Sequence, residues 1–152
     1  MPSAPKPLRV AIIGGGIGGL CAALSIHKHC GSSVTIDIYE QAAQYKEIGA
    51  GVGIGANAAK ILHKIGVGEE TGKIAGIREG YWIQFRKFDD GSEVVDVPAA
   101  ETETRNYPVH RAEFLDVLKN AVTERGVAEM HTNRKLKKIT VGCACQAMST
   151  MF

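Results

Sequence analysis

The sequence predicts an α/β fold built on a parallel sheet, and three observations support this prediction. An apolar run at residues 8–13 is followed by a glycine-rich turn and by a stretch in which apolar residues recur at helical spacing. A second run, residues 34–39, is rich in β-branched side chains. Strand, helix and strand within about 30 residues form a βαβ unit, which joins parallel strands. A hairpin pattern at residues 81–98 adds an antiparallel insertion to this scaffold.

The first strand and its turn have the pattern of a dinucleotide site. Residues 8–13 are apolar apart from Arg9, which is typical of a strand covered on both faces. The turn reads G-x-G-x-x-G, where Gly14 permits the tight turn, Gly16 lets the backbone approach a pyrophosphate and Gly19 lets the helix pack closely. Backbone N–H groups and the helix dipole favour an anion there. Because plain turns also contain such glycines, the flanking elements decide the interpretation.

Those flanking elements complete the unit. The predicted helix has apolar residues at Ile17, Leu20, Cys21 and Leu24, and we expect it to end near Cys30 with Gly31 as its stop. Glu40 ends the second strand some 20 residues after the turn, where a carboxylate can accept hydrogen bonds from ribose hydroxyls. It would also repel a 2′-phosphate, which disfavours NADP as the ligand. A solvated glutamate at a strand end is the alternative.

A second glycine-rich segment follows, in which glycine recurs at every second residue from Gly49 to Gly55. An extended segment of this kind has one bare face, which indicates close approach by a ligand or another chain segment, with a flexible loop as the alternative. We expect Asn57 to cap the next helix, and Gly66 to end it. The apolar face of that helix is predicted to comprise Ala58, Ile61, Leu62 and Ile65.

The next stretch predicts a hairpin of residues 81–88 and 93–98 around a turn at Asp90-Gly91. Its aromatic residues could line a substrate pocket, although packing in a core or interface is the simpler role for any one of them: Tyr81, Trp82, Phe85 and Phe88.

Residues 111–122 predict an amphipathic helix that ends before Gly126. Arg111 at its start is unfavourable against the helix dipole, which suggests an anionic ligand, although a solvated arginine costs little. We expect His110 to pack or to form a hydrogen bond rather than to catalyse. Residues 127–132 and 136–141 predict two more strands, with a basic run along a solvated edge: Arg134, Lys135, Lys137 and Lys138.

Composition indicates one ordinary globular domain. The 152 residues are 45% hydrophobic and carry a net charge of +2, which is too small to indicate nucleic-acid binding. We expect no transmembrane helix and no signal peptide. Cys143-Ala-Cys145 lacks a nearby histidine at ligand spacing, so no metal site is predicted. The four cysteines form no convincing disulfide framework, which favours a reducing, cytoplasmic location.

Three segments carry a resemblance to a known family. They are residues 10–20 with 38–42, residues 47–62 and residues 109–118. In order and spacing the chain resembles the FAD-dependent aromatic hydroxylases (single-component flavoprotein monooxygenases), and most of all those of the fungal salicylate hydroxylase type. The resemblance covers about residues 8–141.

The resemblance implies FAD as cofactor, NAD(P)H as electron donor, O2 as oxygen source and a small aromatic substrate. The turn would surround the pyrophosphate, Glu40 would bind the ribose, and the second glycine segment would approach the flavin. Arg111 would face the phosphate or flavin side. No catalytic residue is assigned, and the implied cofactor-binding residues are Gly14, Gly16, Ile17, Gly18, Gly19, Glu40, Gln41, Gly51, Val52, Gly53 and Arg111.

Members of this family are longer chains, so the resemblance implies a truncated protein that is inactive alone. We expect an extended lead-in at residues 1–7, a partial FAD-binding domain at 8–141 and a disordered, unrelated tail at 142–152. Two alternatives stay open. One is a fragment of an NAD-dependent oxidoreductase, and the other is a non-catalytic interaction protein that self-associates through open sheet edges.

Overall fold

The computed structural model describes residues 7–45, 50–76, 80–98 and 105–140. The chain divides into two units, each of which is described by itself. The first unit comprises Met1–Glu47 and Leu118–Phe152, and the second comprises Ile48–Val117. The predicted lead-in and tail lie almost entirely outside the described residues.

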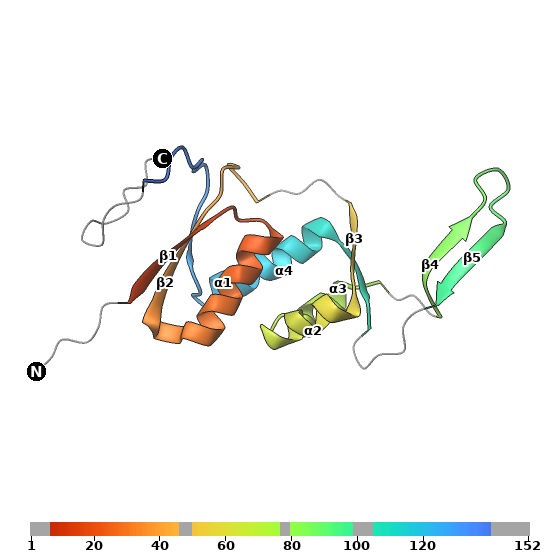
Figure 1. Ribbon diagram of the computed structural model, residues 1–152, viewed down its shortest axis with the longest axis horizontal. Coiled ribbons are helices and arrows are strands. Elements are labelled where there is room, and N and C mark those ends of the chain that lie inside the picture. The colour runs from red at the N-terminus through yellow and green to blue at the C-terminus, as the bar shows by residue number, and fades with distance from the viewer. Residues whose placement is uncertain (1–6, 46–49, 77–79, 99–104, 141–152) are drawn as a thin grey trace, which may run out of the picture. The chain divides into compact units, whose positions relative to one another are not determined.

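The first unit contains the predicted βαβ arrangement. Strand β1 (Leu8–Ile13), helix α1 (Ile17–Cys30) and strand β2 (Val34–Tyr39) follow one another, with a short 3-10 turn (Gly31–Ser33) before β2. Strand β7 (Glu129–His131) pairs with β2, and the sheet order β1-β2-β7 is parallel throughout (Figure 1). Gly31 adopts φ 52° and ends α1 as predicted. The predicted fold class is therefore confirmed.

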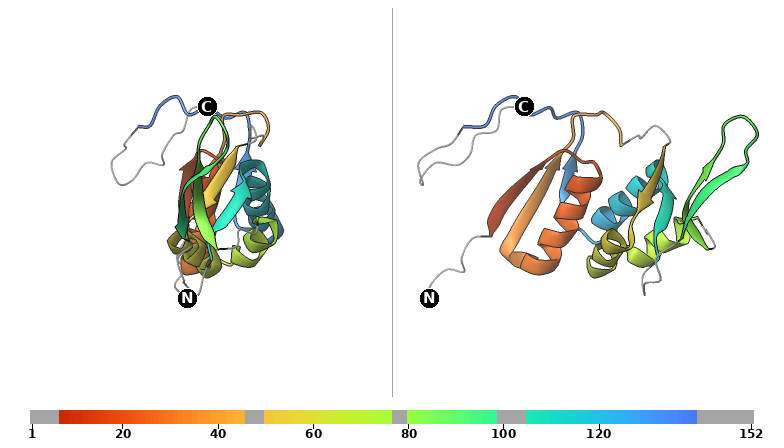
Figure 2. Two further views of the ribbon diagram at one scale, coloured as in Figure 1. Left: turned by 90° about the vertical axis from the view of Figure 1, so that its right-hand side faces the viewer. Right: turned by 45° about the vertical axis from the view of Figure 1, so that its right-hand side comes forward.

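The register of this sheet separates two faces. Ile12, Ile38 and Met130 are aligned on one face, against which α1 packs (Figure 2). This face supplies part of the unit's core, which includes Leu20, Ala23, Leu24, Ile36, Ile38, Leu118, Ala121, Val122 and Val127. The expectation that residues 8–13 are covered on both faces is wrong for the described residues, because Ile13 on the other face is 47% exposed. The apolar run by itself does not indicate that, among the described residues, a helix packs against only one face of this sheet.

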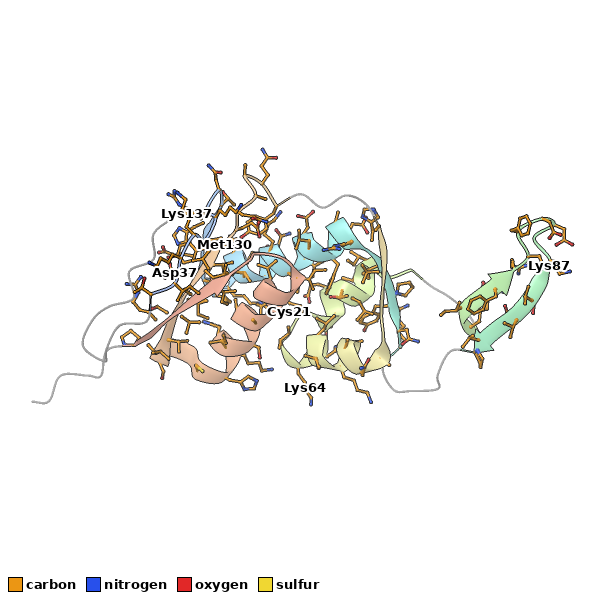
Figure 3. The ribbon with its side chains drawn as sticks, turned by 45° about the horizontal axis from the view of Figure 1, so that its top comes forward. Cys21, Asp37, Lys64, Lys87, Met130 and Lys137 are labelled. Carbon is orange, nitrogen blue, oxygen red and sulfur yellow. The ribbon has the colours of Figure 1, made fainter. Side chains whose placement is uncertain are left out.

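The opposite face of the sheet is polar and aromatic. The two carboxylate oxygens of Asp37 face Arg9 at 3.7 Å and His131 Nε2 at 3.0 Å. The ring of His131 also stacks on Tyr39, with centroids 4.8 Å apart. Figure 3 labels Asp37 on β2, which belongs to this face, and Met130 on the neighbouring strand β7, which belongs to the face against which α1 packs. These contacts tie together side chains from all three strands.

The second unit is built around a short antiparallel pair. Strand β3 (Gly51–Ile54) pairs with β6 (Tyr107–His110), and helices α2 (Ala56–Lys64) and α3 (Gly68–Ile74) lie between them in sequence. Helix α4 (Arg111–Glu124) begins in this unit and continues into the first. The core includes Ile54, Ala59, Leu62, Ile65, Val67, Ala75, Tyr107, Val109, Phe114 and Leu115. Helix α3 and strand β6 were not predicted.

The start of α2 differs from the sequence prediction. Asn57 lies within the helix, exposed, and does not cap it, so that prediction is wrong. The first helical N–H group, that of Ala56, instead donates to Asn106 Oδ1 at 2.8 Å. The buried face also differs, because Ala58 and Ile61 are exposed whereas Ala59 is fully buried.

An Asn106→Ala variant is therefore expected to be less stable than the parent chain. The substitution leaves a helix N–H group without its acceptor, which costs about 1 kcal/mol. For a chain of this size, that cost lowers the melting temperature by roughly 2–4 °C. Thermal unfolding followed by circular dichroism measures the difference. Asn57→Ala is the matched control and should melt within about 1 °C of the parent. Equal losses in the two variants would contradict the assignment of Asn106 as the cap.

The hairpin lies where it was predicted, although its first strand ends at Arg86 instead of residue 88. Strands β4 (Tyr81–Arg86) and β5 (Glu93–Pro98) pair antiparallel, and Lys87, labelled in Figure 3, lies at the turn end. Gln84 donates to Asp96 at 2.9 Å on one face. The other face is apolar and exposed over 37–50% of each side chain, and it consists of Ile83, Phe85, Val95 and Val97. Phe88 in the turn is fully exposed, and the side chain of Trp82 lies outside the described part.

The segment after α4 is only partly as predicted. Gly126 adopts φ 59° and follows the helix as expected, and β7 covers part of the predicted strand 127–132. The predicted strand 136–141 is wrong over its described residues, 136–140, which contain an isolated bridge at Lys138. The N–H groups of Asn133 and Arg134 instead donate to the carbonyl groups of Ala42 and Glu40. This turns the chain back along the loop after β2 and leaves the basic run in solvent.

Candidate functional site

The glycine turn begins directly at the end of β1. Gly14 has φ 102°, a conformation that favours glycine, and its N–H group donates to the carbonyl oxygen of Tyr39 at 2.8 Å. Gly16 is the N-terminal cap residue of α1 and makes no side-chain capping hydrogen bond. The first turn of α1 contains no acidic residue. The N–H groups at this helix end therefore face a region suited to an anion.

The three glycines of the pattern have different surroundings. A Cβ atom on Gly19 would overlap the carbonyl oxygen of Gly14 and lie 3.2 Å from Ile12 on β1. A Cβ atom on Gly16 or Gly18 would have no neighbour within 4 Å. Gly19 thus permits close packing of helix, turn and strand, whereas open space lies beside Gly16, as approach by a pyrophosphate requires.

Glu40 is held in place by backbone donors. Its Oε2 accepts the N–H group of Gly15 at 2.7 Å, and its Oε1 accepts that of Ala42 at 2.8 Å. The backbone N–H group of Glu40 donates to the backbone carbonyl oxygen of His131 on β7 at 2.8 Å. Each carboxylate oxygen keeps a further lone pair for a ligand. The carboxylate therefore lies beside the turn, in a fixed orientation, and fits the ribose role expected of it.

A cavity of about 270 Å³ opens at the carboxyl ends of β1 and β2. In open α/β sheets, ligands bind outside the carboxyl ends of the strands. The cavity is lined by Ile13, Gly14, Tyr39, Glu40, Gln41, Arg134, Lys135 and Leu136. Arg134 and Lys135, predicted as part of a solvated edge, are exposed to solvent but also line this cavity, which the sequence did not indicate. A larger cavity of about 780 Å³ includes residues at the amino ends of β1 and β2, such as Arg9 and Val34, and none of the predicted site residues.

The remaining predicted residues meet in the second unit. Gly51, Val52 and Gly53 lie on β3, and the N–H group of Arg111 donates to the carbonyl oxygen of Ala50 at 2.9 Å. The first residue of α4 is therefore anchored beside the start of β3. A Cβ atom on Gly51 would have no neighbour within 4 Å, so the strand is bare at this point, as predicted from the glycine spacing.

This bare strand borders a cavity of about 470 Å³. The cavity is lined by Gly51, Val52, Gly53, Ile83, Pro108, Val109 and His110. Its walls are backbone and apolar side chains with one histidine, which suits a flat, largely apolar ring. The predicted site residues thus form two local groups, with residues 14, 16–19, 40 and 41 in the first unit and residues 51–53 and 111 in the second.

Among the described residues, one group of three side chains has the composition of a metal site. Asp37, Glu129 and His131 each offer a ligand atom, and these atoms lie within 4.8 Å of one another. Because Asp37 already faces both Arg9 and His131, we interpret the group as the polar face of the sheet. Cys143 and Cys145 lie outside the described residues. In the described part of the chain, no helix has the length and apolar character needed to cross a bilayer.

Comparison with known proteins gives a family match over most of the chain. The profile of a family described as "FAD binding domain" matches residues 7–142. Salicylate hydroxylase of Pseudomonas putida is 38% identical over 132 residues, which cover 84% of this chain and 29% of that protein. The 6-methylsalicylate 1-monooxygenase of Aspergillus terreus is 39% identical over 117 residues, covering 72% and 26% respectively. The 6-hydroxynicotinate 3-monooxygenase of Bordetella bronchiseptica is 30% identical over 139 residues, covering 88% and 34%.

Solved structures show the same fold. The tetrameric form of 2-methyl-3-hydroxypyridine-5-carboxylic acid oxygenase has a TM-score of 0.70 at 19% identity, over 87% of this chain and 33% of that one. CtdE in complex with FAD has a TM-score of 0.67 at 20% identity, over 90% and 33%. The chain therefore spans about a third or less of the proteins that it matches.

Proposed function

Because this chain belongs to the FAD binding domain family, we propose that it forms the FAD-binding part of a monooxygenase that hydroxylates a phenolic or salicylate-like ring. NAD(P)H would be the electron donor and O2 the source of the oxygen atom. The observation that carries the proposal is the fixed carboxylate of Glu40 beside the glycine turn, at the carboxyl ends of β1 and β2. A dinucleotide whose adenosine ribose carries an unmodified 2′-hydroxyl group requires this arrangement.

Each local group would hold one part of FAD. The N–H groups at the start of α1 would donate to the pyrophosphate, and the open space at Gly16 leaves room for it. Glu40 would accept hydrogen bonds from the ribose hydroxyl groups, with Gln41 beside it. Gly51, Val52 and Gly53 would lie along the flavin ring, since their bare backbone borders an apolar cavity. Arg111 would supply positive charge to the phosphate or flavin side.

When bound, the flavin supplies the redox chemistry of the reaction. The part of the residues in this chain is to bind the cofactor, orient it and exclude water from it. The relatives are named for salicylate, 6-methylsalicylate and 6-hydroxynicotinate, which share a ring, a carboxylate and a hydroxyl group. That shared chemistry supports a hydroxylated aromatic acid as the substrate class.

The proposal predicts that the purified 152-residue chain binds FAD. Titration followed by flavin fluorescence should saturate, and FMN should bind at least tenfold more weakly because it lacks the adenosine half that Glu40 would contact. Competition with NAD⁺ distinguishes the oxidoreductase alternative, in which NAD⁺ would displace FAD. Colourless protein that does not respond to FAD would contradict the proposal. It would favour the alternative of a non-catalytic module that self-associates through its open sheet edges.

A further inference from the structure

A tyrosine that belongs to no sequence motif lies on the glycine turn. Tyr45 is in the loop after β2, and its ring rests against Gly15, the second residue of the turn. A Cβ atom on Gly15 would lie 2.5 Å from both Cε1 and the hydroxyl oxygen of Tyr45. Gly15 itself is buried. The phenol therefore covers the turn at the point where the backbone also meets Glu40.

The hydroxyl group of Tyr45 is buried and has no hydrogen-bond partner among the residues that the structure describes. Buried hydroxyl groups in folded proteins almost always have a partner, because a lone one loses its hydrogen bonds to water. The backbone N–H group of Gly15, against which the ring rests, is already used, since it donates to Glu40. An unsatisfied hydroxyl group beside a proposed ligand site indicates a partner supplied by the ligand.

The protonation state of this phenol suits a donor. Burial, together with the negative charge of Glu40, raises the pKa of Tyr45 above its ordinary value. The group therefore keeps its proton at neutral and moderately alkaline pH. The oxygens of a ribose and of a pyrophosphate are all hydrogen-bond acceptors, so an O–H donor is complementary to that half of a dinucleotide.

We infer that Tyr45 is a further cofactor-binding residue, whose hydroxyl group donates a hydrogen bond to an oxygen in the adenosine diphosphate half of FAD. The inference rests on the proposed function. It assigns the contact to that half because the hydroxyl group lies against the glycine turn at Gly15, and the turn and Glu40 would bind the pyrophosphate and the ribose. Tyr45 would thus hold the ligand from the loop that follows β2.

The test compares Tyr45→Phe with the parent chain by titration with FAD, ADP and FMN. Removing one donor to this half should weaken FAD and ADP binding by the same factor, about five- to tenfold, and leave FMN binding unchanged. Tyr81→Phe on the hairpin is the matched control, with no change for any ligand. Unchanged melting temperatures would show that both variants fold.

The other outcomes are distinct from one another. If the parent chain does not bind FAD, the proposed function fails before Tyr45 is tested. If the parent binds FAD and Tyr45→Phe binds it equally well, the inferred hydrogen bond is overturned. Weaker binding of FAD with unchanged binding of ADP would overturn the assignment to the adenosine diphosphate half. Tighter binding by Tyr45→Ala than by the parent would mean that the ring obstructs the site, which also overturns the inference.

Discussion

Gly19→Ala is expected to destabilise the chain by about 2–3 kcal/mol, whereas Gly18→Ala one position earlier should leave it as stable as the parent or more so. The new methyl group at residue 19 would overlap the carbonyl oxygen of Gly14, which is backbone and cannot rotate away. Helix α1 would have to move off the turn. At residue 18 the methyl group meets open space, and alanine is favoured over glycine in a helix by roughly 0.5–1 kcal/mol.

Urea unfolding curves measure this difference as a shift in midpoint at constant slope. Gly16→Ala extends the comparison, because it also meets no atom within 4 Å; as an alanine at the helix N-cap it should lower the midpoint slightly, and by less than Gly19→Ala does. In contrast to Gly18→Ala, it should lose affinity for FAD, since its methyl group would fill the space proposed for the pyrophosphate. Equal midpoints for Gly19→Ala and Gly18→Ala would show that the helix can yield at the turn.

Glu40→Gln is expected to weaken FAD binding about a hundredfold. Two hydrogen bonds from ribose hydroxyl groups to a charged acceptor contribute about 1.5–3 kcal/mol each, and an amide preserves only part of that. The amide also places an NH2 group against the N–H group of either Gly15 or Ala42, so one of the present backbone hydrogen bonds is lost. A small loss of stability, about 1 kcal/mol, should therefore accompany the loss of affinity.

The matched control for Glu40→Gln is Glu129→Gln, which makes the same chemical change on β7 in the same unit. The side chain of Glu129 is 83% exposed, so this variant should bind FAD as the parent does. Flavin fluorescence titration in the same buffer compares all three proteins. If the dissociation constant of Glu40→Gln for FAD lies within twofold of the parent value, Glu40 does not bind the ribose.

The parts of the fold that could be predicted are those specified by neighbours in sequence. The helix at residues 17–30 follows from apolar spacing and ends at Gly31, the glycine predicted to stop it. The hairpin follows from alternation around Asp90-Gly91. The start of α2 could not be predicted, because its acceptor, Asn106, is 50 residues away and meets Ala56 only in the folded chain. Strand β6 was obscured by Pro108, which removes a backbone donor from a short strand.

The candidate site divides in the same way. The glycines and Glu40 were predictable because each is required by the geometry of a βαβ unit around a dinucleotide. Tyr45 and Leu136 carry no local pattern, and Arg134 belongs to a basic run that indicates only a solvated edge. Loops bring Tyr45 against Gly15, and bring Arg134 and Leu136 to the cavity at the carboxyl ends of β1 and β2. Hydrogen bonds from Asn133 and Arg134 to the loop after β2 fold the basic run back and prevent the strand expected at residues 136–140. Tertiary hydrogen bonding outweighed β-propensity there.

The exposed apolar face of the β4–β5 hairpin has a calorimetric consequence. Surface that is hydrated in the folded chain is hydrated after unfolding too, so it adds little to the heat-capacity increment or to the denaturant slope. Side chains such as Phe85, half exposed, and Phe88, fully exposed, are of this kind. A two-stranded ribbon is also marginally stable by itself. Its melting should therefore be nearly silent in a calorimeter, and the measured transition should report the two buried cores.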